Sequence, residues 1–222
     1  MIDIHCHLLP GLDDGPADID EAVALAKKLH SCGVHTVVAT PHFRTGAWRP
    51  PIEDIDAAIA CLKARLTEEG VDIEVIPGAE VGLVDAVELS KEELVALSFG
   101  KQGRYVLLEA PTLMPVEGIE QGIFRAQLSG PRAILAHPER LHAYQMKPER
   151  LASIFSSGVL VQLDARSLLG KEGREAKRAG QVMLRNGHVH FVGSDAHSCG
   201  RRYVDFQELA AYLTSLCGEA GA

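Results

Sequence analysis

The sequence predicts an α/β protein built from about seven repeated strand–helix units. Short runs of apolar and β-branched residues alternate with longer segments whose apolar residues recur with the period of a helix. Gly or Pro often stands at the junctions. Histidines and acidic residues follow the strand candidates, which is where α/β proteins place their functional sites.

Seven segments are short and apolar enough to form buried parallel strands. They are Ile2–His5, Val34–Ala39, Ile73–Pro77, Tyr105–Leu108, Ala133–Ala136, Val159–Leu163 and His188–Val192.

Six segments have helical features. Asp18 is a candidate N-cap for the first, Gly33 follows its end, and Gly70 closes the second. The predicted helices are Asp18–Ser31, Ile52–Glu69, Glu117–Leu128, Pro148–Ser156, Gly173–Arg185 and Phe206–Leu216. No linker divides the chain, so we expect one domain over residues 1–217, followed by a frayed tail at 218–222.

Composition excludes several classes of protein. The chain has 222 residues, 46% of them hydrophobic, which suits one continuous core. Its start lacks the basic and apolar segments of a signal peptide, and no segment approaches about 18 uninterrupted apolar residues. We therefore expect a cytoplasmic protein. A net charge of −8 gives no general attraction for nucleic acid or anionic membranes.

The five cysteines are scattered and form no Cys-x-x-Cys pair, so we expect reduced thiols. None of them has an arginine six positions later. This excludes a cysteine-dependent tyrosine phosphatase.

Metal-capable side chains follow all but one of the strand candidates. His5 and His7 lie on one side of an extended segment because side chains alternate along a strand, and Asp195-Ala196-His197 repeats the arrangement with a carboxylate. Together these residues predict a multinuclear metal site. The candidate ligands are His5, His7, His42, Glu80, Glu109, His137, Asp195 and His197, with one of the adjacent carboxylates Asp13 and Asp14 as a further candidate.

Ordinary structural roles compete with this interpretation. The segment around Asp13 and Asp14 has the composition of a simple turn. Glu80 and Glu109 end apolar runs, where each carboxylate needs a partner, and a salt bridge would serve as well as a cation.

Four arginines are candidates for binding phosphate. Arg140 follows His137-Pro138 and can point back over the strand end, while Arg44, Arg201 and Arg202 lie on loops near other candidate ligands. A surface ion pair is the commoner role for each of them.

The order of these motifs resembles the polymerase-and-histidinol-phosphatase (PHP) superfamily along nearly the whole chain. The N-terminal segment from Asp3 to Gly15, Thr40-Pro41-His42 and His137-Pro138-Glu139-Arg140 are similar to the bacterial tyrosine phosphatases of capsule and exopolysaccharide loci. The segment Ser198–Arg202 departs from the Asn that usually follows the last ligand in the family, so Arg201 and Arg202 both match the second phosphate-binding arginine.

This resemblance implies a distorted, TIM-like (βα)7 barrel with three divalent metal ions, Mn or Fe with Zn as an alternative. His5, His7, Glu80 and Asp195 match the ligands of one ion, with Glu80 bridging to a second. Glu109 and His137 complete the second ion, and Asp14, His42 and His197 match the third.

The resemblance also implies an activity, in which a metal-bound hydroxide attacks phosphorus while Arg140, with Arg201 or Arg202, stabilises the transition state. The expected substrate is a phosphotyrosine protein, namely the tail of a membrane-associated tyrosine kinase in capsule or exopolysaccharide biosynthesis. The alternatives are a small-molecule phosphatase of the histidinol-phosphate type, a phosphodiesterase, or a metal-binding regulatory module without turnover.

Overall fold

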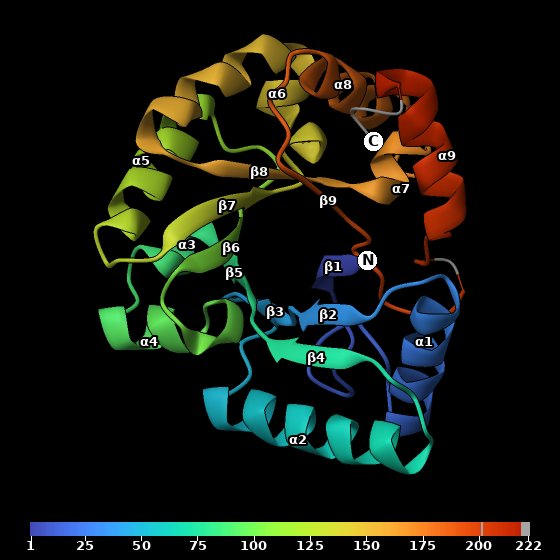
Figure 1. The fold of residues 1–222 in the computed structure, drawn as a ribbon. Helices are drawn as coiled ribbons and strands as arrows, with labels where there is room; N and C mark the ends of the chain where they lie inside the picture. The colour runs from blue at the N-terminus through green and yellow to red at the C-terminus, as the bar shows by residue number, and fades with distance from the viewer. Residues whose placement is uncertain (201, 219–222) are drawn as a thin grey trace.

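The computed structural model describes residues 1–200 and 202–218, and it is a mixed α/β fold with parallel sheets (Figure 1). The strands are β1 (Ile2–Cys6), β2 (Thr36–Ala39), β3 (His42–Phe43), β4 (Glu74–Pro77), β5 (Glu80–Gly82), β6 (Tyr105–Glu109), β7 (Arg132–Ala136), β8 (Leu160–Asp164) and β9 (Phe191–Gly193).

Helices lie outside the strands (Figure 1). The α-helices are α1 (Ile19–Ser31), α2 (Ile52–Glu68), α3 (Leu83–Ala86), α4 (Lys91–Ala96), α5 (Val116–Gln127), α6 (His142–Met146), α7 (Ala165–Leu168), α8 (Arg174–Arg185) and α9 (Phe206–Cys217). Three segments are 3₁₀-helices: η1 (Phe99–Lys101), η2 (Pro138–Arg140) and η3 (Pro148–Ser157).

Each of the seven predicted strands and six predicted helices overlaps an observed element. Most differ from it by one or two residues at the ends, but the predicted strand His188–Val192 begins three residues before β9. One helix differs in type, because Pro148–Ser157 is a 3₁₀-helix. The sequence analysis missed the short elements α3, α4, α6, α7, β3 and β5, which are too brief to show a periodic pattern.

The strands form two parallel sheets, with the orders β1-β2-β4 and β3-β5-β6-β7-β8-β9. The expected (βα)7 barrel is not confirmed, since the described residues show no closed barrel. The second and third strand segments are each interrupted, at Thr40-Pro41 and at Gly78-Ala79 just after Pro77, so that β2 and β4 pair in one sheet while β3 and β5 pair in the other. Proline has no N–H for a strand ladder, which favours a break at these points. On the other side, an isolated bridge joins Cys6 of β1 to Ala196, three residues after the end of β9.

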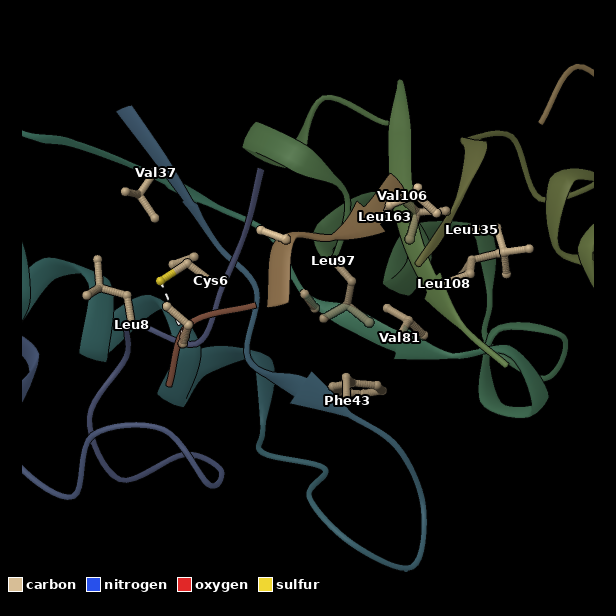
Figure 2. Close-up of a cluster of buried hydrophobic side chains, with 14 of the residues drawn as sticks. Cys6, Leu8, Val37, Phe43, Val81, Leu97, Val106, Leu108, Leu135 and Leu163 are labelled. Carbon is tan, nitrogen blue, oxygen red and sulfur yellow. Dashed lines mark hydrogen bonds between the residues drawn. The ribbon is translucent and has the colours of Figure 1, made fainter. Parts of the chain in front are cut away.

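Apolar side chains fill the space between the strands and the helices (Figure 2). Val106 and Leu108 of β6 belong to this main core, whereas Leu107 faces a second cluster with Ile134 and Leu160. Because side chains alternate along a strand, β6 is buried on both faces. This explains why its sequence is a continuous apolar run.

No helix within residues 1–200 and 202–218 combines the length and the apolar character needed to cross a membrane. Of the predicted tail, Gly218 is described, and residues 219–222 lie outside the described residues. Arg201 lies outside them as well.

Asp18 caps α1 as predicted, because its side chain accepts a hydrogen bond from the Glu21 amide at 2.9 Å. We expect Asp18→Ala to lower the free energy of unfolding by about 1 kcal/mol, the usual cost of a lost N-cap. Urea denaturation would measure this. Asp18→Ser retains a capping oxygen and should keep most of the stability; equal losses in both variants would contradict the capping role.

Candidate metal centre

All nine predicted ligands come together at the carboxyl ends of the strands. His5 lies within β1, and His7 and Asp14 follow it; His42 and Glu80 begin β3 and β5. The remaining ligands lie at or just after the ends of β6, β7 and β9, namely Glu109, His137, Asp195 and His197. Register explains part of this, since His42 pairs directly with Glu80 in the parallel ladder.

Glu80 lies at the centre of the first group, which includes His5 and His7. The Glu80 carboxylate is fully buried and lies 3.5 Å from His5 Nε2 and 3.4 Å from His7 Nε2. Asp195 Oδ1 is 3.4 Å and 3.3 Å from the same two nitrogens. These four residues are the ones that the sequence analysis assigned to one ion.

A second group contains His7, Asp14, His42 and His197. Asp14 Oδ1 lies 3.2 Å from His197 Nε2 and 3.6 Å from His42 Nε2. The ring of His7 stacks on that of His197 with centroids 3.7 Å apart. This is the predicted third-ion set with His7 added.

A third group contains His42, Glu80 and Glu109. His42 Nδ1 is 2.9 Å from Glu80 Oε2 and 3.8 Å from Glu109 Oε2. His137 Nε2 contacts the other Glu80 oxygen, Oε1, at 2.8 Å. The sequence analysis grouped Glu109 with His137, whereas here His42 is the imidazole grouped with Glu109.

The donor atoms suit metal ions better than they suit one another. His42 Nδ1, Glu80 Oε2 and His197 Nε2 are buried and have no hydrogen-bond partner among the described residues. The first two lie 2.9 Å apart without the geometry of a hydrogen bond. His5 Nε2 and His7 Nε2 also converge to 3.3 Å. Lone pairs that converge in a buried space are what a divalent cation requires.

Charge pairing within the cluster shifts the ionisation of its members. Burial lowers the pKa of His5, but Glu80 and Asp195 outweigh it and raise the pKa to about 9. Burial opposes ionisation of Glu80 as well, yet the surrounding histidines, His5 foremost, hold its pKa well below the ordinary value. The protein without metal therefore keeps protons on imidazoles that a metal must displace.

Three residues that the sequence analysis did not assign position the candidate ligands. His7 Nδ1 donates to Asp13 Oδ2 at 2.6 Å, and His5 Nδ1 donates to Gln162 Oε1 at 3.0 Å, so that each Nε2 faces the cluster. Asp3 accepts from the Ser194 hydroxyl and amide and so fixes the approach to Asp195. Asp13 was detectable as the neighbour of Asp14, but Gln162 carried no signal in the sequence.

Backbone conformation also orients two of the candidate ligands. His137 and Asp195 have φ values of 32° and 48°, in the left-handed region that non-glycine residues seldom occupy. Such strain persists only where the surrounding structure fixes it, and it is common at functional sites. Each of these residues follows a strand end and turns its side chain into the cluster.

Three of the four candidate arginines lie within the described residues, and they border this cluster and pair with its carboxylates. Arg140 Nη1 donates to Asp195 at 2.7 Å, Arg202 Nη1 to Asp14 at 2.5 Å, and Arg44 Nη1 to Glu109 at 2.9 Å. Burial disfavours the charged form of Arg140, but Asp195 and Asp164 outweigh it and raise its pKa. The Arg140 guanidinium therefore remains charged beside the candidate ligands.

The cluster forms the floor of a cavity of about 440 Å³. Trp48, Arg166 and Glu172 also line it, and the sequence analysis assigned none of them a role. Trp48 is the single tryptophan of the chain and stacks on His42 with centroids 5.2 Å apart. Its position six residues after His42 was the available signal.

Known proteins resemble this chain in sequence along most of its length. It is 33% identical to the tyrosine-protein phosphatase YwqE of Bacillus subtilis over 210 residues, which cover 94% of this chain and 82% of that protein. It is 29% identical to the tyrosine-protein phosphatase CpsB of Streptococcus pneumoniae, over 91% of this chain and 85% of that one.

Solved structures agree with this relationship. A crystal structure from work on YwqE and CpsB, described there as metal-dependent tyrosine phosphatases, superimposes with a TM-score of 0.89 at 30% identity and covers 100% of this chain and 89% of that one. A putative histidinol phosphatase from Listeria monocytogenes shares the fold, with a TM-score of 0.57, 11% identity and coverage of 90% and 97%. The family described as "Capsular polysaccharide synthesis, CpsB/CapC" matches residues 1–222. The chain therefore belongs to the CpsB/CapC family.

Proposed function

We propose that this protein is a metal-dependent protein-tyrosine phosphatase. The observation that carries the proposal is the gathering of nine histidine and carboxylate side chains at one site, seven of them in candidate metal-binding groups and Asp195 and His137 in contact with them, in a chain whose family relatives are tyrosine-protein phosphatases. The arginines around it supply the additional positive charge that a phosphate ester requires.

The cluster would hold three divalent ions, Mn or Fe. When bound, such ions lower the pKa of water and polarise phosphoryl oxygens, which supplies a nucleophile at neutral pH. Four carboxylates and five neutral imidazoles with three divalent cations leave a net charge of about +2, which suits a phosphate dianion. Asp13 and Gln162 orient His7 and His5 for this task.

Arg140 and Arg202 would bind the phosphoryl group. Both are about a third exposed, at 31% and 35% of the side chain, so they reach the cavity while staying tied to Asp195 and Asp14. Their fixed N–H groups would stabilise the charge on the phosphoryl oxygens as the phenolate leaves. Arg44, paired with Glu109, lies on the opposite wall and is a weaker candidate for this role.

The physiological substrate would be a phosphotyrosine protein, namely the tail of a membrane-associated tyrosine kinase that acts in capsule or exopolysaccharide assembly. The family's description supports a role in polysaccharide synthesis. We place the reaction in the cytoplasm, which fits the free thiols of Cys6, Cys32, Cys61 and Cys199.

Metal removal tests the proposed function directly. We expect chelation to abolish hydrolysis of a phosphotyrosine peptide, and manganese to restore it, with metal analysis giving about three ions per chain. Histidinol phosphate and a phosphodiester would be assayed in parallel. Turnover of either in place of the peptide would reassign the substrate, and a metal-loaded protein inert toward all three would indicate a regulatory module.

Substituting Arg140 tests the proposed phosphate contact. We expect Arg140→Ala to lower kcat/KM for a phosphotyrosine peptide by about a hundredfold, the scale of losing a preorganised donor at the reacting group. Arg140→Lys keeps the charge but loses the planar fork and should recover activity in part. Arg125→Ala, on the exposed face of α5, is the matched control. Wild-type kinetics in Arg140→Ala would contradict the assignment.

Stability without metal should depend on pH through the histidines. The pKa of His5 is raised from 6.5 to about 9, so its stabilising contribution is complete below pH 6.5 and is lost as the pH rises through about 9. We therefore expect the Tm of the chelated protein to fall between pH 6.5 and 9. A Tm that stays level or rises over this range, measured by calorimetry in excess chelator, would contradict the charge pairing.

A further inference from the structure

The loop formed by residues 44–49, beside the metal cavity, is held in place by one buried carboxylate. Asp85 of α3 is 7% exposed and accepts hydrogen bonds from the Thr45 amide at 3.1 Å and from the Thr45 hydroxyl. It also accepts from Arg49 Nη1 at 3.3 Å. A further bond, from the Arg44 amide to the Trp48 carbonyl at 2.6 Å, closes the loop on itself. The loop therefore presents Trp48 at the cavity in a fixed position.

Trp48 differs in chemistry from the other side chains that line the metal cavity. Those described are acidic, basic or imidazole groups, and Trp48 alone supplies a large apolar ring. The ring is partly exposed, rests on His42 and has the Arg44 guanidinium 5.6 Å from its centroid. A flat apolar surface beside a phosphate-binding site suits the ring of an aryl phosphate.

A second cavity, of about 290 Å³, continues outward from this wall. Arg44 and Glu109, joined by their ion pair at 2.9 Å, line both cavities and form the boundary between them. The second cavity runs between the loop and the ends of β5 and β6, and its lining also includes residues 45–47, 82–85 and 110–112. Its lining combines apolar residues, of which Val84 is 54% exposed, with the polar residues Thr45, Asp85 and Thr112.

Sheet order separates the arginines that follow β7, β8 and β9 from the side of the site that carries Trp48 and the second cavity. Arg140, Arg166 and Arg202 follow β7, β8 and β9, whereas the Trp48 loop and the second cavity lie beyond β3, β5 and β6. A phosphate held by these arginines would direct its aryl ester toward Trp48. A polypeptide carrying that ester would then continue over the second cavity.

We propose that the second cavity is a subsite for the polypeptide chain next to the phosphotyrosine, that it prefers an apolar side chain against Val84, and that Trp48 contacts the phosphotyrosine ring. This inference rests on the proposed phosphatase function and extends it to substrate selection. The site would therefore recognise a phosphotyrosine within an extended apolar-flanked segment better than a free aryl phosphate.

The sharpest test introduces a negative charge into the substrate and a positive charge into the subsite. Metal-loaded wild-type protein would be assayed on phosphotyrosine peptides with Leu or Asp at the flanking positions, on each side in turn, and on p-nitrophenyl phosphate. On one side of the phosphotyrosine, we expect kcat/KM to be about tenfold higher for the peptide with Leu than for the peptide with Asp. Val84→Lys should reverse this preference toward Asp. Leu128→Lys, at a 72% exposed position outside both cavities, should retain the wild-type preference.

The proposed contact between Trp48 and the phosphotyrosine ring is tested by measuring KM and kcat separately. Trp48→Ala should raise KM for the peptide about tenfold with a smaller change in kcat, and Trp48→Phe should restore most of the affinity. A Val84→Lys protein with wild-type peptide preference would overturn the subsite, as would equal effects of Val84→Lys and Leu128→Lys. Wild-type protein that hydrolyses none of these esters would instead refute the proposed phosphatase function.

Discussion

The carboxylate of Glu80 is the point on which the rest of the site depends. It is fully buried, and four imidazoles, those of His5, His7, His42 and His137, lie within 3.5 Å of its two oxygens. A buried charge of this kind is costly unless cationic groups surround it. The arrangement of strands satisfies that requirement, because β1, the start of β3 and the end of β7 bring these imidazoles to one place.

Much of the site could be predicted because its ligands obey strand geometry. His5 and His7 share a side of one extended segment, and Glu80, Glu109 and His137 follow apolar runs that could only be strands. Some of the residues that escaped prediction act through other residues. Gln162 orients His5 from within a buried strand, and neither composition nor spacing distinguishes it from an ordinary strand residue.

The individual strands and helices could be predicted from the sequence, but the pairing of the strands into sheets could be predicted less well. Strand and helix segments follow from periodicity, but pairing between neighbours depends on where a strand bends. The breaks at Thr40-Pro41 and Gly78-Ala79 end β2 and β4, and β3 and β5 begin after them in a different sheet. A Cβ at Gly78 would lie 2.9 Å from the Val38 side chain, so this bend also requires close packing that a linear pattern does not reveal.

The division into two sheets has a mechanical consequence for the ligand cluster. His5 belongs to the three-stranded sheet, with His7 just after it, whereas His42 and Glu80 belong to the six-stranded sheet. Any ion shared by these residues would be held from both sheets and would crosslink them at a seam where, among the described residues, no strand of one sheet pairs with a strand of the other. Metal binding would then stabilise the whole fold, so that catalytic activity and resistance to unfolding would both depend on how much of the metal site is occupied.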